Sequence, residues 1–333
     1  MKKIFSFCLT LVLLAGLLTG CGTASDTSAP NTQTKSLHIV TTIFPTYDWV
    51  RTVLGEQADN AEITFLLDNG VDMHSYQPSA EDIMKISSCD VFVYAGGESD
   101  AWASDALKNA SNKNMQVINL LDVLGEHAKE EETVEGMQGA DDHEHGSGEP
   151  SEEEPEYDEH VWLSLKNAQL FVSAIADSLS QADIAHADAY AANAVAYNKQ
   201  LAQLDAAYQS AVDAAPIKTV LFADRFPFRY LVDDYGLSYY AAFSGCSADT
   251  QASFDTIIFL ADKVNELGLH SILTIENSDD KIANTIIQNT QSRDQQVRTL
   301  NSMQTVTSND LASGTTYLSI MKENLSVLLA ALQ

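Results

Sequence analysis

The chain alternates short β-rich runs with helical runs, and few folds accommodate that alternation. It begins with LHIVTTIF, YDWVRTVLG, AEITFLL, PSAEDIMKISS and DVFVYAGG, and resumes later with KTVLFADRF, FRYLVDDYG and LSYYAAF. Strands separated by helices of this length pair in parallel, with helices on both faces of the sheet. The sequence therefore predicts an α/β protein in which two such lobes follow one another.

An Ala-rich segment separates the two stretches of alternation. Residues 184–215 contain mostly helix-forming side chains, and they predict one rigid linker helix of roughly 45 Å. The roughly three hundred residues that follow position 36 are more than one core usually organises. We therefore predict an N-terminal lobe over 37–183 and a C-terminal lobe over 216–333. Both lobes open with a strand that runs into Phe-Pro and an aromatic helix start, IVTTIFPTYDWV and VLFADRFPFRYLV, which supports two similar lobes.

The N-terminus has the pattern of a secretory signal. Lys2 and Lys3 precede an apolar stretch too short for a transmembrane helix, and small residues precede Cys21. This pattern predicts a lipoprotein signal over 1–21 with Cys21 lipidated, followed by a flexible tether over 22–36. We therefore expect the mature chain to be lipid-anchored on the extracytoplasmic face of a bacterial membrane.

The chain is strongly acidic, with 47 Asp and Glu against 18 Lys and Arg. This balance argues against a nucleic-acid surface and favours cationic partners. The excess is concentrated at about 126–159, a segment that also contains His143 and His145. Such a segment cannot bury enough apolar surface to fold alone, so we expect an acidic loop that belongs to the N-terminal lobe.

Two cysteines, Cys89 and Cys246, remain after the signal and the lipidation site. An oxidising exterior permits a disulfide between them, whereas the alternative is two small buried side chains. Their spacing is not that of a cysteine-based zinc site.

Ligands of doubly wound sheets bind where the strands end, so polar residues after strands are the candidates. His74 lies in such a loop, and His160 separates the acidic segment from the apolar run VWL. Each histidine alone is compatible with a solvated or structural role. Asp224, Glu276 and Asp280 also follow strands, where a carboxylate either caps the next helix or joins imidazoles in a zinc or manganese site.

Enzyme signatures are absent from the sequence. It has no Walker A loop, no G-x-S-x-G elbow and no H-E-x-x-H motif. The sequence therefore indicates binding without catalysis.

Several segments resemble the zinc- and manganese-binding solute-binding lipoproteins of bacterial ABC importers: GVDMHSYQPSAEDI, DVFVYAGGESDAW, DEHVWLSLKNA and GTTYLSIMKENLSVLLAAL. The resemblance covers nearly the whole mature chain. It implies a metal ion held between two lobes, with ligand roles at His74 and His160. It also implies an ABC permease and its ATPase as partners, no nucleic acid, and a monomer. A surface adhesin is the alternative function.

The C-terminal half departs from the family pattern. Where relatives have a third ligand, His or Glu, this chain has Arg225, which cannot coordinate a cation. Asp224 is the adjacent candidate. The fourth family position falls at Asp280, with Glu276 nearby as a ligand or a hydrogen-bond acceptor.

The choice of metal depends on the ligands and on the acidic loop. Two histidines with carboxylates favour manganese, whereas the His-bearing loop favours zinc, and we expect zinc. Zinc-type relatives have such a loop before the second histidine, which suggests His143 and His145 as transient ligands that raise the local cation concentration. A solubilising insertion without a metal role is the alternative.

Overall fold

The computed structural model describes residues 36–138, 156–247 and 251–333. They contain two four-stranded parallel sheets, which confirms the predicted fold class. The strands of the first sheet are β1 (His38–Thr41), β2 (Glu62–Phe65), β3 (Val91–Tyr94) and β4 (Gln116–Asn119), in the order β2-β1-β3-β4. Those of the second are β5 (Thr219–Phe226), β6 (Ser238–Ser244), β7 (Ser271–Thr274) and β8 (Gln296–Thr299), in the order β6-β5-β7-β8. The two lobes therefore have the same topology.

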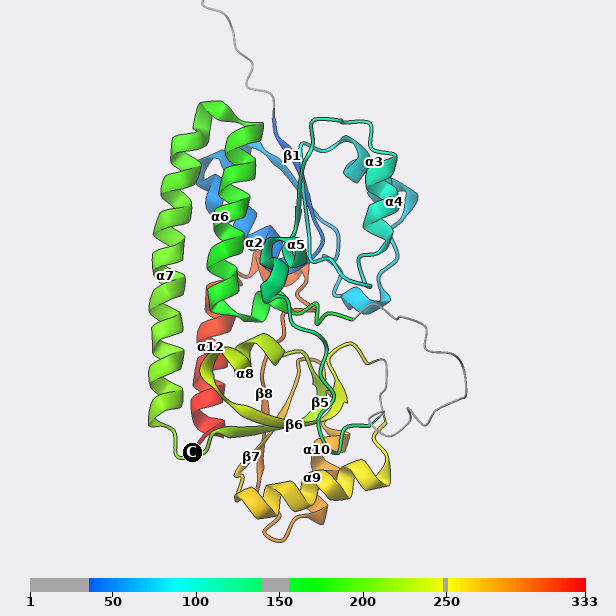
Figure 1. Ribbon diagram of the computed structural model, residues 1–333, viewed down its shortest axis with the longest axis vertical. Coiled ribbons are helices and arrows are strands. Elements are labelled where there is room, and N and C mark those ends of the chain that lie inside the picture. The colour runs from blue at the N-terminus through cyan, green and yellow to red at the C-terminus, as the bar shows by residue number, and fades with distance from the viewer. Residues whose placement is uncertain (1–35, 139–155, 248–250) are drawn as a thin grey trace, which may run out of the picture. The chain divides into compact units, whose positions relative to one another are not determined.

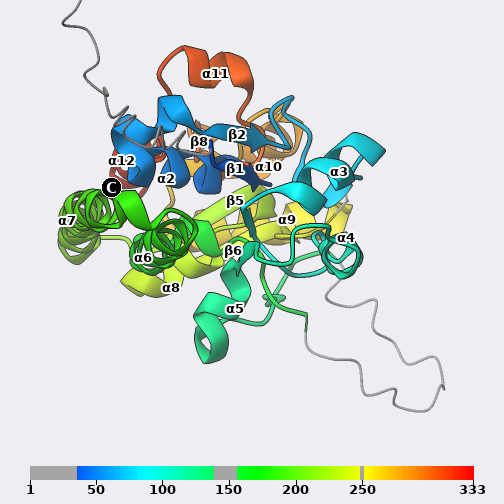
Figure 2. The same ribbon diagram turned by 90° about the horizontal axis from the view of Figure 1, so that it is seen from above.

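Helices cover both faces of the first sheet. They are α2 (Phe44–Leu54), α3 (Ala80–Ser88), α4 (Trp102–Lys108), α5 (Leu120–Leu124) and α6 (Leu165–Ala182). Figure 2 shows α2 and α6 on one side of the strands and α3 and α4 on the other. A capping box begins α3: the Ser79 hydroxyl accepts a hydrogen bond from the Asp82 amide, and the Asp82 carboxylate accepts one from the Ser79 amide.

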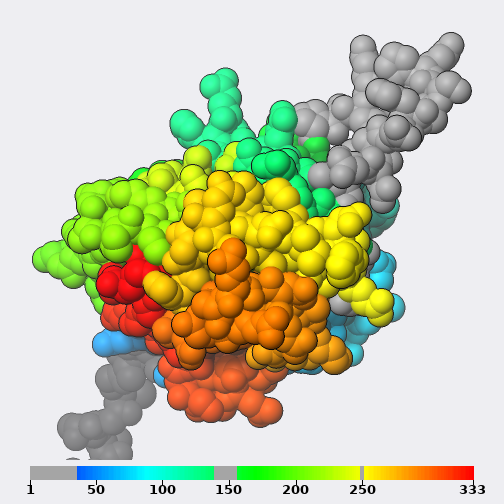
Figure 3. All heavy atoms as spheres, turned by 90° about the horizontal axis from the view of Figure 1, so that it is seen from below, coloured from blue at the N-terminus to red at the C-terminus, as the bar shows by residue number. Residues whose placement is uncertain are grey.

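The second sheet is covered in the same way. Its helices are α8 (Arg229–Tyr235), α9 (Phe254–Leu267), α10 (Lys281–Asn289), α11 (Ser308–Ala312) and α12 (Tyr317–Ala331). Helices α9 and α10 bury a separate apolar cluster against one face of this sheet and form much of the surface seen from below (Figure 3). Helix α12 contacts β7, β8 and also α2 of the first lobe.

The predicted linker helix is α7 (Ala187–Ala214), preceded by the 3-10 turn Ile184–His186. Its 28 residues span about 42 Å at 1.5 Å per residue. Buried residues recur every three or four positions along it, as expected for a helix with one packed face. The Asn193 amide donates to the carbonyl of Val53 in α2, and the Tyr208 hydroxyl donates to the carbonyl of Met321 in α12. Helix α7 thus contacts both lobes (Figure 1).

One hydrophobic core extends through both lobes. It includes Trp49 and Phe171 of the first lobe and Phe222 and Tyr317 of the second, all of them buried. The Tyr317 hydroxyl also donates to the carbonyl of Trp162 at 2.7 Å. Close-packed cores resist continuous deformation, so this shared core opposes rotation of one lobe against the other.

Residues at both ends of the acidic segment, up to 138 and from 156 onward, have defined positions. The loop predicted over about 126–159 is therefore too long at both ends. Lys129 forms an ion pair with Asp233, Arg229 contacts Glu132 at 3.0 Å, and Met137 is buried. Ion pairs of both polarities thus attach this end of the segment to α8, and Arg229 compensates the charge of Glu132. His143 and His145 lie outside the described residues, as do Cys21, the signal and most of the tether. Within the ranges that are described, no helix has the length and apolarity to cross a membrane.

Candidate metal centre

His74 lies in the 3-10 turn Met73–Ser75, in the loop that follows β2. Met73 is buried and anchors the turn, and the Asp72 carboxylate accepts a hydrogen bond from the His74 amide at 3.0 Å. The Ser99 hydroxyl lies 2.8 Å from His74 Nδ1. Backbone and ring are therefore held, and Nε2 is the nitrogen directed toward His160.

His160 is fully buried at the point where the acidic segment enters the core. Asp158 Oδ1 accepts from the His160 amide at 2.8 Å and lies 3.0 Å from His160 Nδ1. The next turn is anchored by Trp162, whose Nε1 donates to the carbonyl of Ser302 in the second lobe. A proton on Nδ1 shared with a carboxylate leaves the lone pair on Nε2, the tautomer that binds metals.

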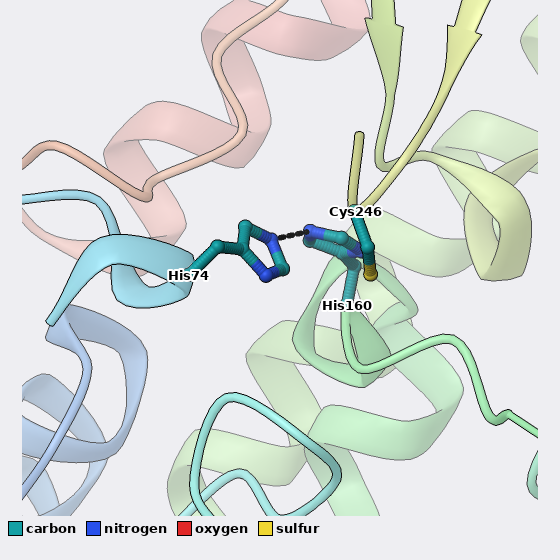
Figure 4. Close-up of side chains that lie close together, drawn as sticks. All are labelled: His74, His160 and Cys246. Atoms are coloured by element: carbon teal, nitrogen blue, oxygen red, sulfur yellow. Dashed lines mark hydrogen bonds between the residues drawn. The ribbon is translucent and has the colours of Figure 1, made fainter. Parts of the chain in front are cut away.

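The two predicted histidines meet between the lobes (Figure 4). Their Nε2 atoms are 3.2 Å apart. Two nitrogen ligands about 2.0–2.1 Å from a tetrahedral zinc ion would be separated by about 3.3 Å, so the spacing fits one shared ion. Burial, followed by repulsion from His160, lowers the pKa of His74 to about 4. The ring is thus neutral and able to coordinate a cation at pH 7.

A third potential ligand, Cys246, was missed by sequence reasoning. The ligand atoms of His74, His160 and Cys246 all lie within 4.8 Å of one another. Cys246 is in the loop after β6, the topological counterpart of the loop that contains His74. That correspondence is the signal that could have identified it, because the carboxyl ends of equivalent strands face one cleft.

The cysteines do not form the disulfide that the sequence permitted. Both Cys89 and Cys246 are free thiols. Cys89 is buried at the end of α3 with its sulfur 3.2 Å from the carbonyl of Ile86, whereas Cys246 lies beside the histidines. The alternative of two separate side chains is the one observed, with Cys246 only partly buried.

The predicted carboxylates lie near the histidines but outside this cluster. Among the described residues, the set that could hold a metal contains only His74, His160 and Cys246. Asp224 and Glu276 line a pocket of about 460 Å³ together with Ser75 and Ser247, the neighbours of His74 and Cys246. Asp280 precedes α10 with a left-handed backbone, φ 56°.

Glu276 already has its hydrogen bonds within the second lobe. Its carboxylate accepts from the Ser302 amide, the Ser302 hydroxyl and the Gln304 amide at 2.6, 2.8 and 3.0 Å. Three donors from the loop after β8 thus hold the Glu276 carboxylate, which follows β7.

Arg225 of the second lobe pairs with Asp72 of the first. Its Nη2 lies 2.6 Å from Asp72 Oδ2, and both side chains are about four-fifths buried. Burial opposes ionisation, but the hydrogen bond and charge of Arg225 lower the pKa of Asp72 overall. Asp72 therefore fixes the His74 turn with one oxygen and joins the lobes with the other.

Glu159 adds a buried carboxylate next to His74. Its Oε1 accepts from the Ser99 amide at 2.8 Å, while Oε2 has no hydrogen-bond partner and lies 3.7 Å from His74 Nδ1. Burial raises the pKa of Glu159. An oxygen without a partner beside a candidate ligand is unusual in a folded protein and indicates a charge yet to be compensated.

Known proteins resemble this chain in sequence and in fold. Residues 39–331 match the profile of the family described as zinc-uptake complex component A, periplasmic. The chain is 32% identical over 295 residues to the zinc-binding lipoprotein AdcA of Streptococcus pneumoniae, a match that covers 88% of this chain and 55% of AdcA. It thus spans about half the length of the curated relatives it matches first.

Two solved structures share the fold. The Zn(II)-bound ZnuA-like domain of S. pneumoniae AdcA superposes with a TM-score of 0.68 at 29% identity, covering 89% of this chain and 99% of that domain. The laminin-binding protein Lmb of Streptococcus agalactiae, described as bifunctional with adhesin and metal transporting activity, has a TM-score of 0.68 at 25% identity and covers 90% of this chain and all of Lmb.

Proposed function

Because the chain belongs to the family of periplasmic zinc-uptake components, we propose that it captures zinc outside the cytoplasm and delivers it to the permease of a bacterial ABC importer. The observation that carries the proposal is the 3.2 Å approach of His74 Nε2 to His160 Nε2. Each imidazole comes from a different loop and has a hydrogen-bond partner on Nδ1. Zinc is the cargo of this site, and the bound form is what the permease and its ATPase receive.

The sequence of events follows from the position of the site. Zinc enters through the pocket lined by Ser75 and Ser247 and binds the two imidazoles. The core shared by both lobes and helix α7 resists a large rotation, so loop movements accompany binding and release. Crystals grown with and without zinc would contradict this account if the lobes rotated substantially.

Zinc is favoured over manganese because imidazole suits it and because the related AdcA domain is Zn(II)-bound. Manganese is the alternative cargo. Zinc would outcompete manganese in vitro at most nitrogen-containing sites, so manganese import would have to rest on metal availability.

Membrane attachment and loop capture complete the proposal. Lipidation at Cys21 would hold the protein next to the permease, in keeping with the description of AdcA as a lipoprotein. His143 and His145 would bind zinc transiently and increase its concentration near the pocket. Adhesion is a second candidate function, favoured by the similarity to Lmb.

The test is a competitive zinc titration of the full-length protein purified in mild detergent. We expect one tight site, and His160→Ala to weaken it at least about a hundredfold, since a buried ligand is lost. His270→Ala, at an exposed histidine, is the matched control and should leave affinity unchanged. Tight one-to-one binding that survives His160→Ala would refute the interlobe site.

A further inference from the structure

We propose that the thiolate of Cys246 is the third protein ligand of the metal and takes the coordinating role that Arg225 cannot fill. This inference rests on the proposed function, because it identifies a ligand of the same site. In this assignment Cys246 takes the place of Asp224, the candidate adjacent to Arg225. The centre then has two histidine ligands and one cysteine ligand.

The geometry allows one ion to reach all three atoms. A tetrahedral zinc ion with nitrogen at about 2.0–2.1 Å and sulfur at about 2.3 Å has ligand atoms about 3.3–3.7 Å apart. The Nε2 atoms of His74 and His160 are 3.2 Å apart, and Cys246 Sγ lies within 4.8 Å of its partners. Figure 4 shows the thiol of Cys246 beside the His160 ring, so a side-chain rotation that moves the sulfur by about 1 Å would let it reach the same ion.

The loop that contains Cys246 is built to lie against His160. A Cβ added to Gly245 would be 3.0 Å from the carbonyl oxygen of Phe226 and 3.1 Å from His160 Cε1, so a glycine permits this close approach. On the next residue, the Cys246 amide donates to Glu131 Oε1 at 3.0 Å. The acidic segment and the histidine therefore fix the cysteine from two sides.

Charges around the cluster favour a divalent cation. Asp158 and Glu159 are both about 2% exposed, and Asp72 is mostly buried. The guanidinium of Arg225 forms its ion pair with Asp72. Buried carboxylates outnumber the guanidinium, and burying unpaired charge is costly. A divalent cation bound at the histidines would offset this excess of negative charge.

The ligand set has two consequences for selectivity and release. A soft thiolate favours zinc and disfavours manganese, which prefers oxygen ligands. Three protein ligands leave the fourth tetrahedral position for water, an exchangeable ligand through which the permease can displace the protein. The pocket next to Ser247 gives that position a route to solvent.

Cobalt(II) is the probe for the sulfur ligand, because cobalt–thiolate bonds absorb in the near ultraviolet and cobalt–imidazole bonds do not. Full-length protein and its Cys246→Ser, Cys89→Ser and His160→Ala variants would be titrated with cobalt and, in competition assays, with zinc. We expect the charge-transfer band in wild type and Cys89→Ser, and its loss in Cys246→Ser with zinc binding weakened at least about a hundredfold. Cys246→His should restore zinc binding without the band.

The outcomes separate the two proposals. If Cys246→Ser retains wild-type zinc affinity and wild type shows no sulfur band, while His160→Ala loses zinc, the thiolate ligand is refuted and zinc capture stands. If wild type takes up no stoichiometric zinc, the proposed function itself fails.

A second measurement needs no variant and so does not depend on folding of the Cys246 mutants. X-ray absorption at the zinc edge of the one-to-one zinc complex should detect one sulfur neighbour at about 2.3 Å beside nitrogen neighbours at about 2.0–2.1 Å. Cys89 is 1% exposed at the end of α3 and does not supply this sulfur. A spectrum with nitrogen and oxygen neighbours alone would overturn the inference.

Discussion

The two lobes have one topology but offer different chemistry to the cleft. In each lobe the loop after the second strand reaches the candidate metal centre, with an imidazole at His74 in the first and a thiol at Cys246 in the second. At the end of β5 the second lobe presents Arg225, which binds Asp72 of the first. The comparison shows that the topology fixes the position of a side chain at the cleft, whereas the residue type decides which ion or group it can bind.

Two glycines next to the candidate metal centre, one in each lobe, test how tightly the two loops are constrained. Gly97 has φ +82°, and an added Cβ would overlap the buried carboxylate of Glu159, whereas Gly245 has only close contacts. We expect Gly97→Ala to lower the free energy of unfolding by about 3 kcal/mol and Gly245→Ala by about 1 kcal/mol. Urea denaturation of metal-free protein, followed by circular dichroism, measures both. Equal losses would mean that the two loops are equally constrained.

The buried carboxyls of the first lobe predict a pH dependence. Burial raises the pKa of Asp100 to about 7 and that of Asp48 to about 6. A raised folded pKa gives stability that is complete below the unfolded value near 4 and is lost as the pH rises through the folded value. We therefore expect these groups to lower the free energy of unfolding between pH 4 and 8.

The Asp100→Asn substitution isolates its share of that change. The variant should lose less stability than wild type between pH 4 and 8, by on the order of 2 kcal/mol, and should match wild type near pH 4. Denaturation at each pH gives the comparison. Parallel pH profiles for the two proteins would contradict an ionising Asp100.

The ion pair between the lobes should contribute less. Arg225→Gln leaves Asp72 partly buried without its partner, so we expect the free energy of unfolding to fall by about 1–2 kcal/mol. Lys281→Gln is the matched control, because Lys281 pairs with Asp279 at the surface and is 82% exposed. Scanning calorimetry should detect the first change and no shift for the second. Identical melting curves for Arg225→Gln and wild type would indicate that the pair does not join the lobes.

The smallest expected effect concerns the acidic segment. Replacing residues 139–155 by a short Gly-Ser linker should leave the equilibrium zinc affinity unchanged and slow capture at limiting zinc about threefold, because local cation attraction is lost. The double substitution His143→Ala, His145→Ala separates imidazole from carboxylate contributions. Stopped-flow competition with a zinc indicator measures the rate. Wild-type capture rates in both variants would leave the segment as a solubilising insertion.

The fold followed from the sequence because its signals are local. The β-rich run before His74 became a strand, the run that was expected to end before Asp224 became β5 and includes Asp224, and the Ala-rich segment is α7. Local patterns and the topology rule were sufficient for the fold. The approach of His74 to His160 was implied by the family resemblance, because each histidine taken alone also fitted a solvated or structural role.

Interactions between distant residues could not be predicted in this way. The sequence indicated that Arg225 cannot bind a cation, but nothing local pairs it with Asp72, 153 positions away. Cys246 was assessed by cysteine spacing, which says nothing about a thiol next to histidines from other segments. The ordered ends of the acidic segment depend on Arg229 and Asp233 of α8, so composition alone suggested a longer loop.

The hairpin of α6 and α7 has a consequence for the order of folding. The two helices follow each other after a short turn and pack along their lengths, so their contacts are local in sequence and form early. The residues of the metal centre come from three distant segments and meet only after both sheets have assembled. A newly synthesised chain should therefore complete its scaffold first, and the candidate metal centre should form at the last stage of folding.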